Sequence, residues 1–460
     1  MKDNPTRREF VKTSATAVTA LASAPAMLRG RNVNDTVRMG FIGVGNRGSQ
    51  LLQLFHQHQD VKVAALCDVY EPYVNRDRSK VHPKMLESLG GRIPDLDEEL
   101  SSYKTYSDFR ELLDDPDIDA VCIATPDHWH ALQTVMACQA GKDVYVEKPL
   151  TMTIHEGRKM VEIANATNRV VGVGLNRRGS TVFKHVVDWV QQGKIGEVAI
   201  ALAGRVSNMF HDGIGTYPAV DPPADLDWDM WLGPRAYRPY QFNIAPYKFR
   251  WWSDYSSQMG NWGVHYIDCI RWMLDKQAPI AVTAQGSRQL IQDDSDIPDT
   301  MEVVFEFDDG ALLKFSIHEA CSGTIVPGGE VELRGTKGNL IAGERGYKVT
   351  AARPGQFQEW SPPEIAEQKS IADLLGDPEA RENTTGNLVR NFIDCVKSRN
   401  TPWCPLEEGH RSTTFALMAN IALARGKRLE WGAQQERFTN DDEANTMLHY
   451  NYRQPWTLEG

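Results

Sequence analysis

The chain has 460 residues, a formal net charge of −11 and 41% hydrophobic residues. This length predicts two or three domains, and the hydrophobic content is ordinary for a globular protein. The acidic balance argues against a nucleic-acid binder, because no basic stripe is available to neutralise phosphates. No apolar run in the sequence is long enough to predict a membrane span.

The seven cysteines are scattered, without a CxxC pair or a His–Cys cluster at metal-ligand spacing. The sequence therefore predicts no metal site. Most of the cysteines stand in apolar stretches, so we expect buried free thiols. These are Cys67, Cys122, Cys138 and Cys269.

The first 34 residues have the layout of an export signal. Arg7 and Arg8 precede a weakly apolar stretch, 18–28, which contains small residues suited to cleavage. This arrangement is typical of a twin-arginine signal, whose route carries folded proteins, often with a cofactor already bound. We therefore exclude 1–34 from the fold and expect a periplasmic or otherwise exported protein. The alternative is a disordered basic tail.

A glycine-rich loop follows the first apolar run, 37–42. Gly43, Gly45 and Gly48 form a GxGxxG pattern between a predicted strand and a predicted helix, which is the context of a dinucleotide-binding loop. Gly43 permits the tight turn, Gly45 lets the backbone approach a pyrophosphate, and Gly48 lets the helix pack on the strand. The helix that follows offers free N–H groups to the phosphates.

The second apolar run, 61–67, ends in Asp68, twenty residues after Gly48. A carboxylate there accepts hydrogen bonds from the adenosine ribose hydroxyls and repels a 2′-phosphate. The sequence therefore predicts NAD rather than NADP as the cofactor. The alternative is a glycine-rich turn in an unrelated α/β domain.

Strands and helices alternate up to residue 150, which predicts βαβ units and a parallel sheet. The strand 120–124 runs into Thr125 and Pro126, and the strand 144–146 ends in 147–149, Glu-Lys-Pro. Because the carboxyl ends of parallel strands meet at one edge, we expect these residues beside the glycine loop. A lysine at that edge can reach a cofactor or a substrate. The alternative is a solvated surface ion pair.

Helix starts in this half carry further polar residues. Ser107 is expected to cap a helix over 108–113. His128 and His130 precede the helix that runs to residue 140, and they are open to two interpretations. They are either ligands or acids, or helix-start residues that hydrogen-bond locally.

The chain changes character from Val198 onwards. Short β-rich runs separated by Asp-Gly, Gly-Gly and Lys-Gly turns predict a mostly antiparallel sheet. The clearest runs are 303–307, 311–317, 331–334 and 347–351. The predicted fold is α/β, with a Rossmann dinucleotide-binding domain at 35–150, an α+β domain at 151–430, and a tail at 431–460 that packs on the body or on a neighbour.

The segment 210–262 is dense in aromatic residues and rich in Pro and Gly. Aromatic faces stack on the apolar faces of sugars, so this segment predicts a wall of a sugar-binding cleft. The alternative is an insertion that packs its aromatics inside its own domain. We expect a few of them to face the cleft.

Polar and aromatic residues then recur at helical spacing. Asn261, His265, Asp268 and Trp272 fall on one face of a predicted helix. Because Asp268 stands one turn from His265, we expect the carboxylate to orient the imidazole. His265 is then the natural group to take a proton near neutral pH. A structural histidine is the alternative.

These motifs together resemble the Gfo/Idh/MocA oxidoreductases, relatives of glucose–fructose oxidoreductase and inositol dehydrogenase, over nearly the whole chain after the signal. The resemblance implies that Lys148 contacts nicotinamide and substrate, that Pro149 is a cis proline, and that His265 serves as acid/base. Many members place an aspartate one turn before that histidine, where this chain has Asn261. Asparagine takes no proton, so we expect His265 to be the base, with Lys148 assisting.

The predicted site combines strand ends of the first domain with the later helix. The predicted catalytic residues are Lys148, His265 and Asn261. The predicted cofactor-binding residues are Gly43, Gly45, Asn46, Arg47, Gly48, Asp68, Thr125, Pro126, His130, Glu147, Lys148 and Asn176. The predicted substrate-binding residues are Lys148, Arg177, Trp252, Asn261 and His265.

The expected function is NAD(H)-dependent oxidation of a sugar, polyol or glycoside hydroxyl by hydride transfer to a tightly bound cofactor. An exported enzyme lacks a dependable pool of free NAD, so we expect the cofactor to be regenerated within one cycle. Two alternatives stay open: an NAD-dependent glycoside hydrolase or lyase working through a transient keto-sugar, and a non-catalytic sugar-binding protein. We expect a homo-oligomer, a dimer or tetramer formed through the C-terminal sheet, and no nucleic-acid partner.

Overall fold

The computed structural model describes residues 36–88 and 103–458. The predicted export signal at 1–34 lies outside the described residues. No helix of the described segments has the length and hydropathy of a membrane span.

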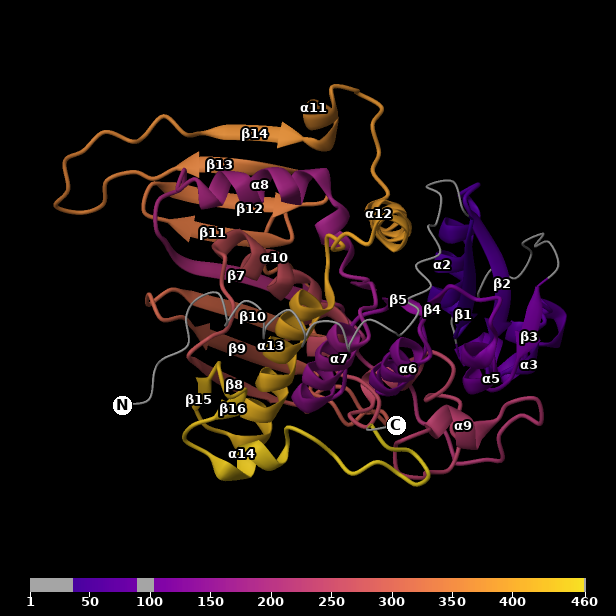
Figure 1. Cartoon of the computed structure of the whole chain (residues 1–460). Coiled ribbons are helices and arrows are strands. Elements are labelled where there is room, and N and C mark those ends of the chain that lie inside the picture. Colours follow the sequence, from indigo (N-terminus) through magenta and orange to yellow (C-terminus); the bar gives the residue numbers. More distant parts are fainter. Residues whose placement is uncertain (1–35, 89–102, 459–460) are drawn as a thin grey trace, which may run out of the picture. The chain divides into compact units, whose positions relative to one another are not determined.

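The first sheet has six strands in the order β3-β2-β1-β4-β5-β6, all parallel (Figure 1). The strand order reverses between β1 and β4, and in such sheets ligands bind outside the carboxyl ends of the strands at this point. The strands are β1 (Val37–Ile42), β2 (Val61–Cys67), β3 (Lys104–Tyr106), β4 (Ala120–Ile123), β5 (Asp143–Val146) and β6 (Val171–Val173). The helices of this half are α2 (Asn46–His56), α3 (Glu71–Val74), α4 (Pro83–Ser88), α5 (Phe109–Asp114), α6 (Asp127–Gln139) and α7 (Ile154–Ala166), with a 3-10 turn η1 (Arg78–Lys80).

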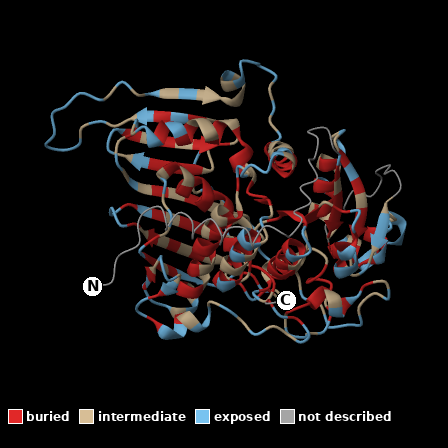
Figure 2. Ribbon diagram, in the orientation of Figure 1, coloured by how far each residue is buried: buried red, intermediate tan, exposed pale blue. Residues whose placement is uncertain are grey.

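Burial explains why the central strands are continuous apolar runs. Every residue of β4 and β5 is buried, as expected for parallel strands that are covered on both faces (Figure 2). Helix α5 begins at Phe109, and the side chain of Asp108 caps it by accepting a hydrogen bond from Arg110 N. The prediction of Ser107 as this cap is wrong, because the helix starts one residue later than expected.

The second sheet has ten strands in the order β14-β13-β12-β11-β7-β10-β9-β8-β15-β16. All neighbouring pairs are antiparallel except β7 with β10, so the predicted mostly antiparallel sheet is confirmed. Helices α8, α10 and α13 pack on one face of this sheet (Figure 1). The strands are β7 (Val198–Val206), β8 (Ala281–Ser287), β9 (Thr300–Glu306), β10 (Leu312–His318), β11 (Val331–Gly335), β12 (Gly338–Gly343), β13 (Gly346–Ala351), β14 (Glu367–Ser370), β15 (Leu429–Gly432) and β16 (Arg437–Phe438). The remaining elements are η2 (Asn176–Gly179), α8 (Thr181–Gln191), α9 (Trp228–Leu232), η3 (Lys248–Trp251), the π-helical turn η4 (Met259–Gly263), α10 (Val264–Leu274), α11 (Ile371–Leu375), α12 (Thr384–Ser398), α13 (Leu406–Arg425) and α14 (Asp442–Thr446).

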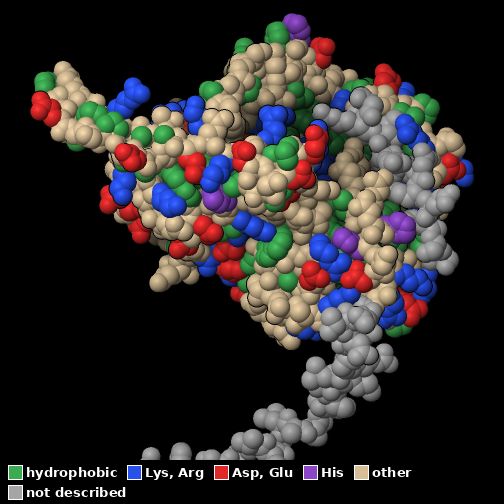
Figure 3. Space-filling model, turned by 90° about the horizontal axis from the view of Figure 1, so that it is seen from above, with side chains coloured by type: hydrophobic (Ala, Val, Ile, Leu, Met, Phe, Trp, Pro, Cys, Tyr) green, Lys and Arg blue, Asp and Glu red, His purple; other side chains and the backbone are tan. Residues whose placement is uncertain are grey.

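Alternation along β9 shows how this sheet divides core from surface. Met301, Val303 and Phe305 are buried, and the residues between them are half-buried. Each such apolar side chain contributes roughly 1.5–3 kcal/mol when it leaves water. The opposite face is polar, with a hydrogen bond of 2.8 Å between His318 Nε2 and Glu302 Oε1. Acidic and basic side chains are also interspersed on the face drawn in Figure 3.

The C-terminal segment returns to the first half of the chain. The Trp456 ring lies 4.9 Å from that of Trp129 and 6.1 Å from that of Phe109, measured between centroids. The hydroxyl of Tyr452 donates to Glu156 Oε1 over 2.6 Å. The tail therefore contributes side chains to the core beside α5, α6 and α7.

Candidate functional site

The glycine loop between β1 and α2 has the backbone geometry of an anion cradle. Gly43 has a φ of +82°, which favours glycine, and a Cβ there would lie 2.8 Å from Thr125 N. A Cβ on Gly48 would lie 1.9 Å from Gly43 O, so helix α2 packs against the loop at a distance that only glycine allows. Gly45 precedes the helix and has no side chain to cap it. The first N–H groups of α2 are therefore suited to a phosphate.

Asp68 connects this loop to the end of β2. Its Oδ2 accepts a hydrogen bond of 2.8 Å from Val44 N, and its Oδ1 accepts one of 3.0 Å from Tyr70 N. Burial raises the pKa of Asp68 to about 6, against the opposing effect of these backbone donors. The carboxylate thus holds the glycine loop in place as well as facing the cavity beside it.

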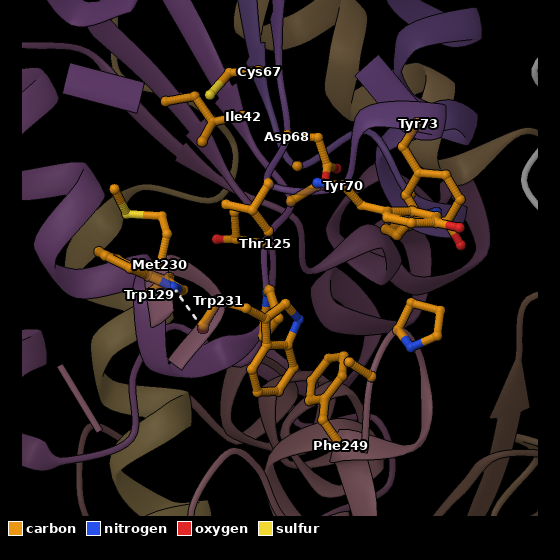
Figure 4. A pocket seen from close by; sticks show the side chains of 18 of the residues that line it. Ile42, Cys67, Asp68, Tyr70, Tyr73, Thr125, Trp129, Met230, Trp231 and Phe249 are labelled. Carbon is orange, nitrogen blue, oxygen red and sulfur yellow. Dashed lines mark hydrogen bonds between the residues drawn. The ribbon is translucent and has the colours of Figure 1, made fainter. Parts of the chain in front are cut away.

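That cavity, which we call the dinucleotide cavity, is lined by the loop glycines, Asp68, Thr125 and a set of aromatic rings. Figure 4 shows Asp68, Thr125 and Trp231 around the same space. The residues fit an NAD molecule: backbone N–H groups for the phosphates, a carboxylate for the ribose, and flat apolar faces for the adenine. The rings that line it are those of Tyr70, Tyr73, Phe109, Trp129, Trp231, Tyr247 and Phe249.

A second cavity of about 300 Å³ lies at the carboxyl ends of β4 and β5, and we call it the lysine cavity. It shares Arg47, Thr125 and Arg250 with the dinucleotide cavity, so the two adjoin. Most predicted site residues meet here, although their positions in the chain differ by more than 200. Its predicted residues are Asn46, Arg47, Thr125, Glu147, Lys148, Asn176, Arg177, Asn261 and His265.

Lys148 is held at the centre of this cavity. Its Nζ donates to Asn261 O over 2.9 Å and to Asn261 Oδ1 over 3.0 Å. Loss of hydration lowers the pKa of Lys148 to about 8, although Glu147 acts in the opposite direction. The peptide bond between Lys148 and Pro149 is cis, as the family resemblance implies.

Glu147 is buried beside Lys148, and its charge is paired. Its Oε1 accepts a hydrogen bond of 2.8 Å from Arg47 Nε. A Cβ on Gly174 would lie 2.8 Å from the same oxygen, so the strand end after β6 approaches the carboxylate closely. The Glu147–Arg47 pair joins the end of β5 to the first turn of α2, where the predicted cofactor-binding residues gather.

His265 lies in the first turn of α10 and is 8% exposed. Burial, and then the positive charges of Arg177, Lys148 and Arg47, hold its pKa well below the usual range. The imidazole is therefore neutral at physiological pH and a weak proton acceptor. Its Nδ1 has no hydrogen-bond partner among the described residues.

The prediction that Asp268 orients His265 is wrong. The Asp268 carboxylate accepts hydrogen bonds from Arg178 Nε at 2.9 Å, from Arg178 Nη2 at 2.9 Å, and from Ser412 Oγ at 2.7 Å. Trp272 stacks over the same guanidinium, with 5.2 Å from Arg178 Cζ to the ring centroid. Asp268 and Trp272 therefore belong to a contact between α10, η2 and α13, whereas Asn261 and His265 reach the lysine cavity.

Arg177 forms the opposite wall of the lysine cavity. Its Nη2 lies 2.8 Å from Glu330 Oε1, and its Nη1 donates to Asn176 Oδ1 over 3.1 Å. The guanidinium also lies over the ring of Tyr266, 5.3 Å from the centroid. This arrangement fixes a cation in the wall of the lysine cavity.

Three predicted residues lie outside both cavities, namely Gly48, Trp252 and His130. Gly48 serves the packing of α2 on the loop, and the assignments of Trp252 and His130 are corrected. Trp252 is 5% exposed in the core, and its Nε1 donates to Asn243 O over 2.8 Å. His130 is 1% exposed and hydrogen-bonds Pro149 O at 2.7 Å and Thr125 O at 2.9 Å. His130 thus links the residues that follow β4 and β5 by hydrogen bonds to their backbone. This is the second of the two interpretations that the sequence left open, a helix-start residue that hydrogen-bonds locally.

Six further residues line the lysine cavity without having been predicted, namely Gln50, Ala124, Asp127, Tyr247, Arg250 and Trp262. Asp127 directly follows Thr125-Pro126, so its place after a strand end was a usable signal. Tyr247 and Arg250 come from the aromatic segment, where nothing in the local sequence separates cavity residues from core residues. The expectation that a few of these aromatics face the cleft is met by Tyr247.

Comparisons with known proteins agree with this architecture. Residues 37–175 match the model of the oxidoreductase family NAD-binding Rossmann fold of Gfo/Idh/MocA proteins, and residues 182–343 and 353–458 match the C-terminal α/β domain of the same family. Among solved structures, a levoglucosan dehydrogenase in complex with NADH and levoglucosan has a TM-score of 0.60 at 18% identity, over 86% of this chain and 99% of that one. An aldose-aldose oxidoreductase from Caulobacter crescentus has a TM-score of 0.59 at 15% identity, over 86% and 99%.

Curated relatives match over shorter segments. A "Glycosyl hydrolase family 109 protein" of Shewanella baltica is 28% identical over 215 residues, which are 42% of this chain and 44% of that protein. An "Alpha-N-acetylgalactosaminidase" of Shewanella oneidensis is 30% identical over 168 residues, 36% of this chain and 34% of that protein. The matches span less than half the length of these relatives. From the two family models, which together follow both sheets, the chain belongs to the Gfo/Idh/MocA oxidoreductase family, with an NAD-binding Rossmann domain followed by the family's C-terminal α/β domain.

Proposed function

We propose that this protein oxidises a hydroxyl-bearing carbon of a sugar, polyol or glycoside, with NAD bound in the dinucleotide cavity. The observation that carries the proposal is the position of Lys148, an amine with a pKa of about 8 in a cavity that adjoins the dinucleotide cavity. Bound NAD supplies the hydride acceptor. The amine supplies what such an oxidation also needs, a base for the hydroxyl proton.

In this proposal Lys148 is the proton acceptor and His265 orients the substrate. A neutral amine is present in a useful fraction near neutral pH because its pKa is lowered. The imidazole of His265, held neutral by burial and three neighbouring cations, hydrogen-bonds a substrate hydroxyl without taking its proton. This assignment exchanges the roles that the sequence predicts for the two residues.

The surroundings of Lys148 favour negative charge on the substrate oxygen. Arg177 is fixed by Glu330 and Arg47 by Glu147, so both cations keep their positions when a substrate enters. Preorganised charges of this kind stabilise an oxyanion more than mobile ones, because no reorganisation is needed during the reaction. Asn261 holds the amine in place through its two oxygens.

A second candidate function is redox-neutral cleavage of a glycosidic bond. The curated relatives carry glycoside-hydrolase names, which favours this alternative. Oxidation of a sugar hydroxyl to a ketone acidifies the neighbouring C–H, elimination then breaks the glycosidic bond, and the reducing equivalent returns to the product. The base at Lys148 and the neutral imidazole at His265 serve this chemistry as well.

Assays on a single protein preparation distinguish these candidate functions. The protein is purified without added cofactor, tested for bound NAD, and then assayed on aldoses and aryl glycosides with and without external NAD. Net NADH formation supports the dehydrogenase, and bond cleavage without NADH supports the glycoside hydrolase or lyase. Saturable sugar binding without either product would select the non-catalytic alternative and contradict the proposal.

We also propose export by the twin-arginine route and assembly into a homo-oligomer through the outward face of the ten-stranded sheet. The paired arginines Arg7 and Arg8 support the first. The half-buried face of β9 and β10 supports the second. Cell fractionation of an Arg7→Lys/Arg8→Lys variant and the mass of the protein in solution test them.

A further inference from the structure

A third cavity, of about 370 Å³, lies behind the lysine cavity, and we call it the rear cavity. Apolar side chains of β9, β10 and α13 form much of its surface. A group of hydroxyl and amide side chains lies at the end nearest Lys148. These polar residues are Ser256, Ser257, Gln258, Thr413 and Asn420.

The wall between the two cavities is thin. Lys148 lines the lysine cavity and Pro149, the next residue, lines the rear cavity. In the same way Asn261 lines the first and Gly260 the second. A Cβ on Gly260 would lie 3.1 Å from Pro149 Cγ, so the two chain segments press directly against each other.

Asp127 lies in the wall between the lysine cavity and the rear cavity. It is the one residue that lines both cavities, counted over 36–88 and 103–458. Its side chain is 5% exposed, and its Oδ2 accepts a hydrogen bond from Ser256 Oγ on the rear side. Burial raises the pKa of this carboxyl, while His130, Arg250 and Lys148, the charged or titratable groups that act on it, favour the carboxylate.

We propose that Asp127 exchanges the proton of Lys148 with water in the rear cavity. The inference rests on the proposed function, in which Lys148 receives the hydroxyl proton. The substrate O–H bond would break and its proton would join the Lys148 amine, while bound NAD would accept the hydride from the adjoining carbon. The ammonium then passes its proton to the Asp127 carboxylate through a water in the lysine cavity, which both side chains line, and the carboxylic acid releases it to a water beside Ser256. Asp127 and Lys148 return to their starting states.

A rear route would be needed when the lysine cavity is filled. Nicotinamide and substrate bound there would cover the side of Lys148 that faces this cavity, so they would block exchange with solvent by that path. The rear cavity has room for roughly ten waters, at about 30 Å³ each. Its hydroxyl and amide groups provide the two to four partners that an ordered water needs.

The test uses Asp127→Asn, which keeps a hydrogen-bond acceptor for Ser256 but carries no proton. We expect NAD binding to be unchanged and kcat to fall on the order of 10²-fold, the size of effect typical of a proton-transfer group. Imidazole added as a small proton carrier restores kcat in proportion to its concentration, and the solvent isotope effect on kcat increases. A purely structural role of Asp127 would give neither response.

Two further variants make the result decisive. Asp296→Asn removes a carboxylate that lines only the rear cavity and is bonded to Ser253, so kcat stays at the wild-type value without imidazole. Ser256→Ala leaves Asp127 in place but removes its contact on the rear side, so we expect a smaller loss that imidazole also restores.

The outcomes also separate this inference from the proposed function. Wild-type turnover that Lys148→Ala abolishes supports the function. If the function is established in this way, two results would overturn the proton route alone. One is a normal kcat in Asp127→Asn. The other is a loss of kcat in both Asp127→Asn and Ser256→Ala that imidazole does not restore. A wild-type protein that turns over no glycoside or aldose overturns the function itself.

Discussion

The Nζ atom of Lys148 lies 2.9 Å from the backbone oxygen of Asn261 and 3.0 Å from its side-chain oxygen. These contacts join the end of β5 to the π-helical turn η4, and thus the NAD-binding domain to the second domain. Neither oxygen of Asn261 carries a full charge, so the two hydrogen bonds hold the amine in place without the pKa increase that a carboxylate would cause. Burial can therefore lower the pKa of Lys148. Asn261 therefore sets the position of the amine, and burial sets its basicity.

Replacement of Lys148 by alanine is expected to abolish turnover and leave NAD binding intact. The amine reaches the lysine cavity, whereas the phosphate cradle is made by Gly43, Gly45 and the start of α2. Bound NAD is measured by its release on denaturation, and turnover by product formation. Lys62→Ala, an exposed lysine on β2, is the matched control and retains activity. Near-normal turnover in Lys148→Ala would show that another group takes the proton.

The pH dependence of kcat/KM is expected to show an acidic limb near the pKa of Lys148, about 8. Below that pH the amine is protonated and unable to act as a base, so the rate falls tenfold for each pH unit. Above it the neutral amine predominates and the rate levels off. An acidic limb near the ordinary pKa of histidine would instead indicate that His265 is the base.

Asn261→Asp places a carboxylate against the Lys148 amine. An opposite charge at this distance favours the ammonium and raises the pKa of Lys148, so the acidic limb moves to higher pH. Activity at neutral pH then falls on the order of tenfold, since each pKa unit changes the neutral fraction by that factor. The pH–rate profile is compared with that of Asn339→Asp, on β12. An increase in activity at neutral pH would mean that the new carboxylate itself takes the proton.

Asp68→Asn is expected to weaken discrimination between NAD and NADP. The amide oxygen still accepts a hydrogen bond from Val44 N, which preserves the glycine loop, but the charge that repels a 2′-phosphate is lost. The ratio of dissociation constants for NADP and NAD falls by roughly 10-fold or more, as 1.4 kcal/mol or more of repulsion is removed. Equal losses of affinity for both cofactors would instead indicate damage to the loop.

Asp268→Ala is expected to destabilise the fold while leaving the pH–rate profile unchanged. The carboxylate is buried and paired with Arg178, so its removal leaves that guanidinium with Glu408 as its remaining ionic partner and costs on the order of 3 kcal/mol of unfolding free energy. Denaturant unfolding measures this loss. A shift of the acidic limb in the folded variant would reveal a link to His265 that the geometry does not contain.

The elements of the first domain were predictable because their signals are local. The strands 37–42 and 61–67 have the bounds that the hydrophobic pattern predicts, and buried parallel strands need continuous apolar runs. Strands β12 and β14 were not predicted. β14 is Glu-Gln-Lys-Ser, and pairing with β13 rather than its own composition makes it a strand.

The site residues likewise divide into those that local sequence predicts and those that only the folded structure reveals. Lys148 and Asp68 stand directly after apolar strands, where the sheet topology alone brings them to the ligand edge. Helical spacing placed Asp268 on the same face as His265, but Arg178 and Ser412, which come from distant segments, hold its carboxylate in a structural contact. Trp252 was indistinguishable from a cavity aromatic until its burial was known.

The sequence by itself determined the family, the glycine cradle and the NAD preference implied by Asp68, and it predicted a lysine at the ligand edge, because each depends on a motif contiguous with a strand end. The proposal that Lys148 rather than His265 is the base rests on the tertiary structure alone. Basicity depends on burial and on charges contributed by distant segments, as when Arg47, Lys148 and Arg177 converge on His265. The rear cavity, and the place of Asp127 between two cavities, also depend on segments that are distant in the sequence and meet only in the folded protein. No local sequence pattern encodes such an arrangement.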